Sequence, residues 1–311
     1  MTPLALALSL ALQAAPAPQK APPPKPAAPA KTVSTPTTPE DLTASTRAWH
    51  EQRLQRLQSE EGWLTLVGLF WLKEGEQTAG SAPESELDFP AGTPAKLGTF
   101  TRKGNTVSFQ PAPGVRFTRN NEPFTGGELT TDEKGSPDVV QLGSLNFQVI
   151  LRGDKLGVRV KDSQAQARKE FHGIATYPAS PTWKVTARFE PSATPRTLQV
   201  PNVLGTTEEM KAPGTLVFTV DGKEYRLTPV EEEGSNQLFI IFADETNRDA
   251  TYGAGRFLYS DMPKDGQVVL DFNRSYNPPC AFTRFATCPL PPRGNRLAVR
   301  VEAGEKRYGD H

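Results

Sequence analysis

Short runs of β-branched and aromatic residues, separated by turn residues, follow one another from Gly62 almost to the end of the chain. Their spacing is that of hairpins, whereas a helical period dominates only before Gly62. A dozen or so short strands at this spacing predict a mainly antiparallel barrel or sandwich. The expected fold class is therefore all-β with an N-terminal helix, and 163–171 is a candidate for a short second helix.

Three hairpins can be placed from their turn residues. The clearest joins 215–220 to 224–228 through Asp221-Gly222, a pair that tolerates the positive φ of a tight primed turn. The other two turn at Gly104-Asn105 and at Gly153-Asp154. The segment Tyr252 to Gly255 leads into a strand and not a helix, so we interpret it as a turn where two backbones approach. Further strands are expected over 182–189, 237–242, 255–260, 267–272 and 296–302.

The segment before Gly62 has the signals of a helix. Thr38 is an N-cap candidate, Pro39 suits the first helical position, and acidic residues follow where the helix dipole favours them. A period of 3.6 residues then divides the helix into two faces. The inward face is expected to hold Thr46, Trp49, His50, Leu54 and Leu57, and the outward face Arg53, Gln55, Arg56 and Glu60.

Residues 1–17 have the composition of a secretory signal peptide. Leu4 to Leu12 is a Leu/Ala run followed by small residues, although no basic side chain precedes it. Residues 18–39 are rich in proline and alanine and are expected to be a disordered linker. Residues 40–311 are expected to form one β-rich domain. We therefore expect a periplasmic or secreted protein, the alternative being a cytoplasmic protein with a disordered tail.

The charge balance and the absence of known catalytic and binding motifs limit the classes of partner that this chain is expected to have. The chain has 35 basic and 35 acidic residues, mixed along its length, without the basic stripe of a nucleic-acid binder. No apolar run approaches the roughly 20 residues that span a bilayer, so a soluble protein is expected. Phosphate-loop, dinucleotide, paired-histidine and nucleophile-elbow motifs are absent. We expect no cofactor and no metal, and a partner that is a small polar molecule, a glycan or an envelope protein.

Cys280 and Cys288 are the only cysteines and lie in a proline-rich segment. In an oxidising compartment they are candidates for a disulfide, which would add roughly 2.5 kcal/mol by closing a short loop. His172 is the one histidine in a loop within the predicted domain, where an imidazole can serve as acid, base or ligand. A lone histidine is more often a structural residue, so this role depends on its neighbours.

The densest polar cluster runs from Asp271 to Phe282. If the chain is extended at its start, Asp271, Asn273 and Ser275 project to one side. These groups can hold a small polar ligand, or they can satisfy the backbone of a loop whose prolines lack N–H groups. The candidate catalytic residues are His172 and Asp271, and the candidate ligand-binding residues are Arg256, Asn273, Arg274, Tyr276 and Asn277.

Four segments carry a further pattern: Trp63 to Gly75, Thr251 to Leu258, Asp271 to Phe282, and Cys288 to Glu305. Together they resemble the bacterial and archaeal domain-of-unknown-function family 1684, over residues about 45 to 306. The resemblance implies a single domain with few helices. Because the family has no established activity, the resemblance implies no substrate and no catalytic residues.

Two functional hypotheses follow. In the first, the chain is an exported domain that binds or hydrolyses a small polar ligand at a site formed by the Asp271 to Asn277 segment, with His172 reaching in. In the second, it is a non-catalytic envelope interaction module in which that segment is a structural clasp. The sequence leaves open whether the chain is an enzyme. A cavity that joins His172 to the segment would favour the first hypothesis.

Overall fold

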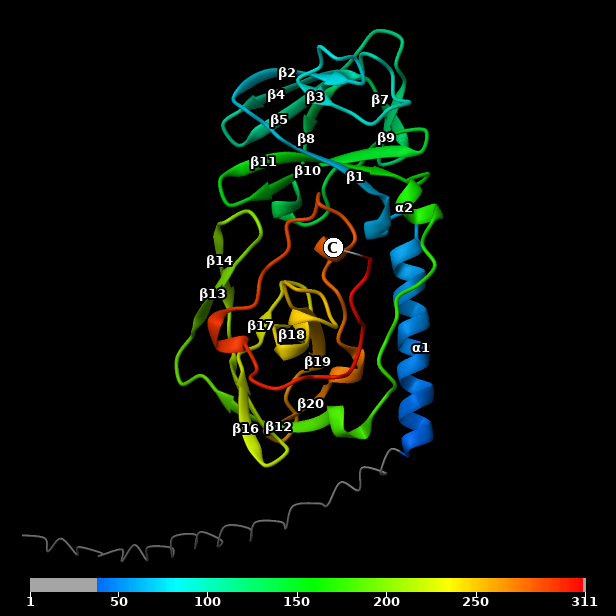
Figure 1. Ribbon diagram of the computed structural model, residues 1–311. Helices are drawn as coiled ribbons and strands as arrows, with labels where there is room; N and C mark the ends of the chain where they lie inside the picture. The colour runs from blue at the N-terminus through cyan, green and yellow to red at the C-terminus, as the bar shows by residue number, and fades with distance from the viewer. Residues whose placement is uncertain (1–37, 310–311) are drawn as a thin grey trace, which may run out of the picture. The chain divides into compact units, whose positions relative to one another are not determined.

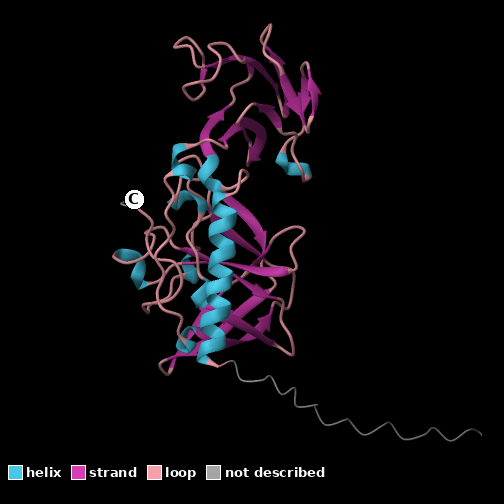
Figure 2. Cartoon of the chain, turned by 90° about the vertical axis from the view of Figure 1, so that its right-hand side faces the viewer, coloured by secondary structure: helices cyan, strands magenta, loops and turns pink. Residues whose placement is uncertain are grey.

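The N-terminal helix is placed by its first residues, as predicted. The computed structural model describes residues 38–309, so the predicted leader, almost all of the linker and His311 lie outside the described residues. Helix α1 (Pro39–Gln58) begins with a capping box in which Thr38 Oγ1 accepts a hydrogen bond from the Asp41 amide. It is by far the longer of the two α-helices that this range contains (Figure 2). A four-residue helix α2 (Gln166–Lys169) confirms the short second helix.

Strands of the N-terminal half form two sheets that pack around one apolar core. A six-stranded sheet has the order β1-β11-β10-β9-β6-β7, and a five-stranded sheet has the order β3-β2-β4-β5-β8. Phenylalanines from both sheets, among them Phe100, Phe109 and Phe147, contact one another in the core. The strands are β1 (Leu66–Trp71), β2 (Gly75–Gly80), β3 (Leu87–Asp88), β4 (Gly98–Lys103), β5 (Thr106–Pro111), β6 (Phe117–Arg119), β7 (Glu122–Phe124), β8 (Gly127–Leu129), β9 (Val140–Leu142), β10 (Leu145–Arg152) and β11 (Lys155–Asp162).

The C-terminal half contains three further sheets (Figure 1). Their orders are β16-β15-β12-β20, β17-β18-β19 and β13-β14. Side chains of the first two sheets share a second apolar core around Phe242 and Phe272. The strands are β12 (Lys184–Pro191), β13 (Thr197–Pro201), β14 (Thr207–Lys211), β15 (Gly214–Val220), β16 (Lys223–Leu227), β17 (Val230–Glu231), β18 (Gln237–Phe242), β19 (Arg256–Asp261) and β20 (Gln267–Asp271).

The predicted class is confirmed, because nearly all strand pairs are antiparallel and each sheet within residues 38–309 remains open. All three predicted hairpins form. In the clearest one, Asp221 and Gly222 both have positive φ, at 50° and 77°. Gly255 is also at positive φ, and a Cβ there would lie 2.6 Å from the Phe242 carbonyl oxygen. The turn at Tyr252 to Gly255 is therefore a close approach of two backbones, as interpreted.

The strand expected over 296–302 is wrong. Apart from one bridge between Arg296 and Ala243, this segment does not pair as a strand. At Val301 the backbone is satisfied by side chains instead: its amide donates to Asp244 and its carbonyl accepts from Arg256. Leu297 and Val301 pack into the second core without forming a strand.

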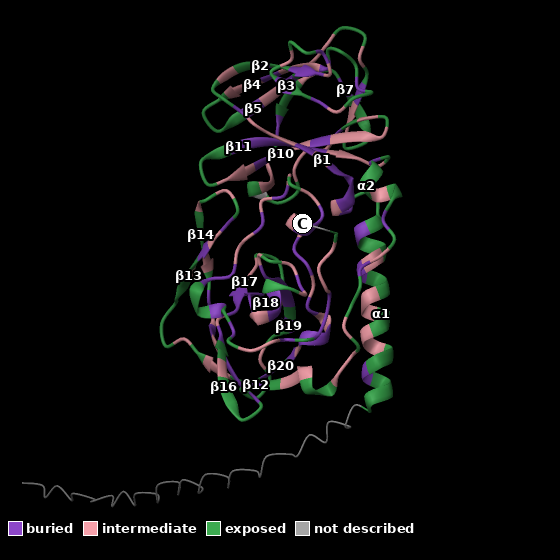
Figure 3. Ribbon diagram, viewed as in Figure 1, coloured by how far each residue is buried: buried purple, intermediate pink, exposed green. Residues whose placement is uncertain are grey.

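The outward placement of Arg53 on helix α1 is also wrong. Only 8 % of Arg53 is exposed, while much of the same helix is exposed (Figure 3). Its Nε donates to Glu305 and its Nη2 donates to the Asn277 carbonyl, so the charge is neutralised where it is buried. Residues 38–309 form one compact unit. Among the described residues, no helix has both the length and the apolar character needed to cross a membrane.

Candidate functional site

Arg256, a predicted ligand-binding residue, is fully buried within the protein's own polar groups. Its Nη2 donates to Asp244 at 2.7 Å and to the Val301 carbonyl at 2.8 Å, and its Nη1 donates to the Ala303 carbonyl. Asp244 also accepts from the Thr246 and Val301 amides. The position of Arg256 is fixed by β19, but its guanidinium does not reach solvent.

Asn277 and Glu305 extend this set of buried contacts. The Asn277 amide donates to Glu305 Oε2 at 2.7 Å, and Asn277 Nδ2 donates to the Lys306 carbonyl. Glu305 has no exposed surface and pairs with Arg53 at 3.2 Å. We call Asp244, Arg256, Asn277 and Glu305 the buried polar network. Every one of these side chains is engaged by the chain itself.

The chain at Asp271 to Arg274 does not continue as the extended segment that was expected. A 3-10 turn, η5 (Phe272–Arg274), begins directly after β20 because Asp271 accepts a hydrogen bond from the Asn273 amide. Asn273 then bonds both the amide and the carbonyl of Ser180, and Arg274 pairs with Asp271 at 3.4 Å. The alternating projection predicted for Asp271, Asn273 and Ser275 is therefore wrong.

The predicted residues do not meet at one cavity. His172 is exposed and lines neither cavity described below, whereas Asn277 and Arg256 are buried. The two cavities described below have volumes of about 200 and 430 Å³, and Tyr276 lines the one of about 430 Å³. Arg274 lines a neighbouring cavity of about 460 Å³, which Tyr276 also lines. Because His172 and the Asp271 to Asn277 segment are separate, the geometry does not support their acting together.

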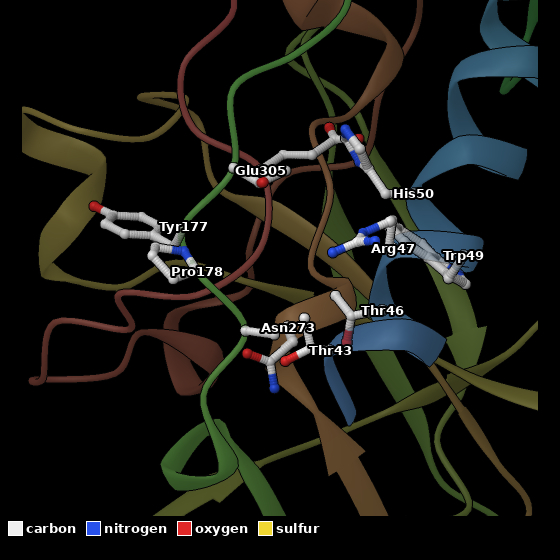
Figure 4. A pocket seen from close by; sticks show the side chains of 11 residues that line it. Thr43, Thr46, Arg47, Trp49, His50, Tyr177, Pro178, Asn273 and Glu305 are labelled. Carbon is white, nitrogen blue, oxygen red and sulfur yellow. The ribbon is translucent and has the colours of Figure 1, made fainter. Parts of the chain in front are cut away.

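A small cavity of about 200 Å³ lies between helix α1 and the segment 176–179 (Figure 4). Helix α1 contributes Thr46, Arg47 and His50, and Asn273 lines it as well. Thr46 Oγ1 and His50 Nδ1 are buried there without hydrogen-bond partners. Of the charged groups in the lining, Arg47 is exposed and Glu305 is paired with Arg53, so this cavity offers polar contacts but no strong attraction for a charged ligand.

A larger cavity of about 430 Å³ has a different character. Its floor is apolar and belongs to a core cluster that includes Phe239, Phe257 and Cys288. Basic side chains line it from α1, β10 and β11, and acidic ones from β14 and from the residue after β17. Its volume falls within the range of roughly 300–1,000 Å³ that is usual for small-molecule sites. We call it the Arg159 cavity.

Arg159 is the central basic group of this cavity. It is only 6 % exposed, and no carboxylate of residues 38–309 lies within 4.0 Å of its nitrogen atoms. Nη2 donates weakly to Thr287 Oγ1 at 3.4 Å, and Nε has no partner. Its guanidinium lies 5.4 Å from the Trp63 ring centroid. Burial, with the nearby charge of Arg152, lowers the pKa of Arg159 to about 10.

Two tyrosines form another part of the lining. The rings of Tyr259 and Tyr276 are stacked with centroids 6.3 Å apart, and Arg53 lies 4.7 Å from the Tyr276 ring. The Tyr259 hydroxyl donates to Glu232, which lines the same cavity. Burial raises the pKa of both tyrosines above the ordinary value, so both are hydrogen-bond donors at neutral pH.

The two cysteines meet beside this cavity as free thiols. The Cys280 amide donates to Cys288 Sγ at 3.0 Å, and Cys288 lines the cavity. A hydrogen bond with Cys288 lowers the pKa of Cys280, and the same interaction, together with burial, raises the pKa of Cys288. The two cysteines are close together but are free thiols in this structure, so the disulfide stays a prediction.

Sequence reasoning missed Arg159, Arg152, Trp63 and Thr287. On β11, Arg159 stands between Val158 and Val160, which is the alternation of a strand with one solvent-facing side. The arginine side of β11 is covered instead by the segment that carries Thr287, 128 residues further along. No local signal in the sequence marks that contact.

The fold and these sites define a mainly antiparallel β protein with a ligand-sized, arginine-lined cavity. Residues 169–306 match the family described as protein of unknown function (DUF1684), and the chain belongs to this family. The match is narrower than the resemblance over 45–306, and Arg53, Trp63, Arg152 and Arg159 lie outside it.

One solved structure with similarity to this chain is the solution NMR structure of an uncharacterized protein of Haloarcula marismortui. It is 30% identical, covers 46% of this chain and 81% of its own, and superposes with a TM-score of 0.39. No curated protein matches the chain.

Proposed function

We propose that the chain binds a small organic anion in the Arg159 cavity. The observation that carries this proposal is a guanidinium, 6 % exposed, that has no carboxylate within 4.0 Å among the described residues and lines a cavity of about 430 Å³. Burying a charge without a partner costs several kcal/mol. An anion entering the cavity supplies the missing countercharge, so its binding energy offsets that cost.

The surroundings of Arg159 suit a carboxylate or a comparable planar anion. Thr287 Oγ1 lies 3.4 Å from Arg159 Nη2 and 3.3 Å from Arg152 Nε, so one hydroxyl stands between two guanidinium groups. Arg152 is already paired with Asp132 at 2.8 Å and therefore adds a hydrogen-bond donor more than a free charge. Arginine donors in a forked geometry match the two oxygens of a carboxylate.

The apolar floor indicates the rest of the ligand. Phe239, Phe257 and Met210 line the cavity beneath the polar groups, and burying an apolar body against them contributes roughly 25 cal/mol per Å². A ligand with an anionic end and an apolar or aromatic body uses both features. The proposal keeps the small polar ligand expected from the sequence and moves its site from the Asp271 to Asn277 segment to this cavity. It includes no hydrolytic step.

We also propose that the chain is exported, to the periplasm or outside the cell. The support is the composition of residues 1–17 and 18–39, namely a Leu/Ala run followed by a proline-rich stretch. Export would place Cys280 and Cys288 in an oxidising compartment, where they are able to form a disulfide. Fractionation of cells that express the full chain, followed by mass determination of its N-terminus, tests this part of the proposal.

The test of the binding proposal is calorimetric titration of the full chain with a panel of organic acids. Arg159→Met should weaken binding by about 10- to 100-fold, the value of one or two charge-assisted hydrogen bonds. Arg116→Met is the matched control, because Arg116 is exposed and does not line the cavity. If no acid binds, or if Arg159→Met binds as tightly as the unaltered chain, the proposal is wrong.

The second candidate function is a non-catalytic envelope interaction module. The observation that favours it is the buried polar network, whose side chains bond to the chain itself as a structural clasp would. Under this proposal the full chain captures an envelope protein or a glycan, and Arg159→Met leaves that capture unchanged. The same variant therefore separates the two candidates.

A further inference from the structure

The charges that line the Arg159 cavity do not balance one another. Two of its three arginines already have countercharges that lie outside the lining: Arg53 pairs with Glu305 at 3.2 Å and Arg152 with Asp132 at 2.8 Å. Arg159 is the arginine left without one among the described residues. A ligand therefore meets one uncompensated positive charge in this cavity.

Two acidic side chains of the lining are uncompensated as well. Glu208 is exposed on β14, and Glu232 is half-buried directly after β17. Within residues 38–309 neither carboxylate has a cation within 4.0 Å, and Glu232 only accepts a hydrogen bond from Tyr259. In a site made for a simple anion, two free carboxylates would repel the ligand.

The acidic side of the cavity also carries aromatic rings. Tyr259 bonds Glu232 and stacks with Phe239 at 4.9 Å between centroids and with Tyr276 at 6.3 Å. These rings are stacked on one another, and Arg53 lies over Tyr276, so the attraction for an ammonium group comes from the carboxylates. The basic side, by contrast, holds Arg159 and the Thr287 hydroxyl. The two kinds of group come from different strands, β11 on one side and β14 and β19 on the other.

We propose that the ligand is dipolar, with a carboxylate for Arg159, an ammonium group for Glu232 and Glu208, and an apolar body between them. Amino acids and short peptides form this class. The inference rests on the proposed anion site and adds a second, positive charge to the ligand. The two ends add to each other: the carboxylate compensates Arg159, and the ammonium group removes the repulsion by the two acids.

A matched set of probes tests the inference on the full chain. Phenylalanine carries both charges, 3-phenylpropionate only the carboxylate, and phenethylamine only the ammonium group. Equivalent sets built on indole and isobutyl bodies cover other side-chain sizes. By calorimetric titration, the dipolar member of the best-fitting set should bind at least about tenfold tighter than either singly charged member, as expected for one further charge-assisted contact.

Variants assign each charge to its residue. Glu232→Gln should reduce the affinity for the dipolar probe to that for the matching acid, while the affinity for the acid is unchanged or rises. Arg159→Met should weaken both. Glu209→Gln is the matched control, because Glu209 lies beside Glu208 on β14 and bonds Gln199 rather than lining the cavity.

Failure of the inference and failure of the proposed function are distinguishable. If the acids bind as tightly as the dipolar probes, or if the preference survives the double variant Glu208→Gln/Glu232→Gln, the dipolar ligand is wrong and the anion site stands. If no acid and no dipolar probe binds, or if Arg159→Met has no effect on either, both proposals are wrong.

Discussion

Two buried arginines of this chain, Arg256 and Arg159, have opposite surroundings. Arg256 is fully buried, pairs with Asp244 at 2.7 Å and donates to the carbonyls of Val301 and Ala303. Arg159 is 6 % exposed and has a single weak hydrogen bond, to Thr287 at 3.4 Å. The Nε of each lacks a partner, so the difference lies in the countercharge. A buried charge that the fold neutralises serves the fold, whereas one left uncompensated beside a cavity is available to a ligand.

The largest effect is expected at Arg256. Arg256→Met should lower the free energy of unfolding by about 3–5 kcal/mol, because it leaves the Asp244 carboxylate buried without its cation. Urea denaturation of the full chain measures this. The double variant Arg256→Met/Asp244→Leu should recover part of the loss, since it removes the unpaired charge. Equal losses for Arg256→Met and Arg159→Met would erase the distinction between the two arginines.

Arg53 belongs with Arg256 and should show a smaller effect. Arg53→Met removes the pair with Glu305 at 3.2 Å and the hydrogen bond to the Asn277 carbonyl. We expect a loss of about 1–3 kcal/mol in urea denaturation, because this pair is longer than the 2.7 Å pair of Arg256 with Asp244 and is not completely buried. The control is Arg56→Met, one turn further along the same helix at an exposed position. An effect no larger than that of the control would mean that the pair does not hold helix α1 in place.

The contrast between Arg256 and Arg159 also marks what the sequence was able to predict. Local signals succeeded: the Thr38 cap and the Asp221-Gly222 turn depend on residues near one another in the chain. The fold class followed from the same signals, because turn spacing selects antiparallel pairing.

Two of the failures involve distant partners. The strand over 296–302 was lost to hydrogen bonds with Asp244 and Arg256, and Arg53 is buried because Glu305 lies 252 residues away. Of the candidate site, sequence reasoning found Tyr276 and missed Arg159. The sequence prediction selected the segment with the most polar residues, and the fold satisfies those residues internally. The number of polar residues in a segment does not indicate whether they have partners in the folded chain.

At Arg159 we expect almost no change in stability. Arg159→Met should alter the free energy of unfolding by about 1 kcal/mol or less, because the variant removes a desolvated charge that has no carboxylate within 4.0 Å among the described residues. Urea denaturation without ligand measures this, with Arg256→Met as the comparison. A loss of several kcal/mol would show that Arg159 is a structural residue.

The smallest effect concerns the thiols next to the Arg159 cavity. The pKa of Cys280 is lowered by its hydrogen bond with Cys288, and that of Cys288 is raised. Because the thiolate is the reactive form, iodoacetamide should modify Cys280 first in the reduced chain, at a rate that rises with pH through the pKa of Cys280.

Cys288→Ser tests the cause of this order of reaction. A serine hydroxyl can still donate a hydrogen bond to the Cys280 sulfur, whereas Cys288→Ala removes the donor and should raise the pKa of Cys280 toward its ordinary value. We therefore expect alkylation of Cys280 near neutral pH, followed by mass spectrometry, to slow about two- to fivefold in Cys288→Ala and less in Cys288→Ser. Faster modification of Cys288 than of Cys280 would contradict the assignment. The two cysteines therefore resemble the two arginines, because in each pair the contacts of the side chain determine its chemistry.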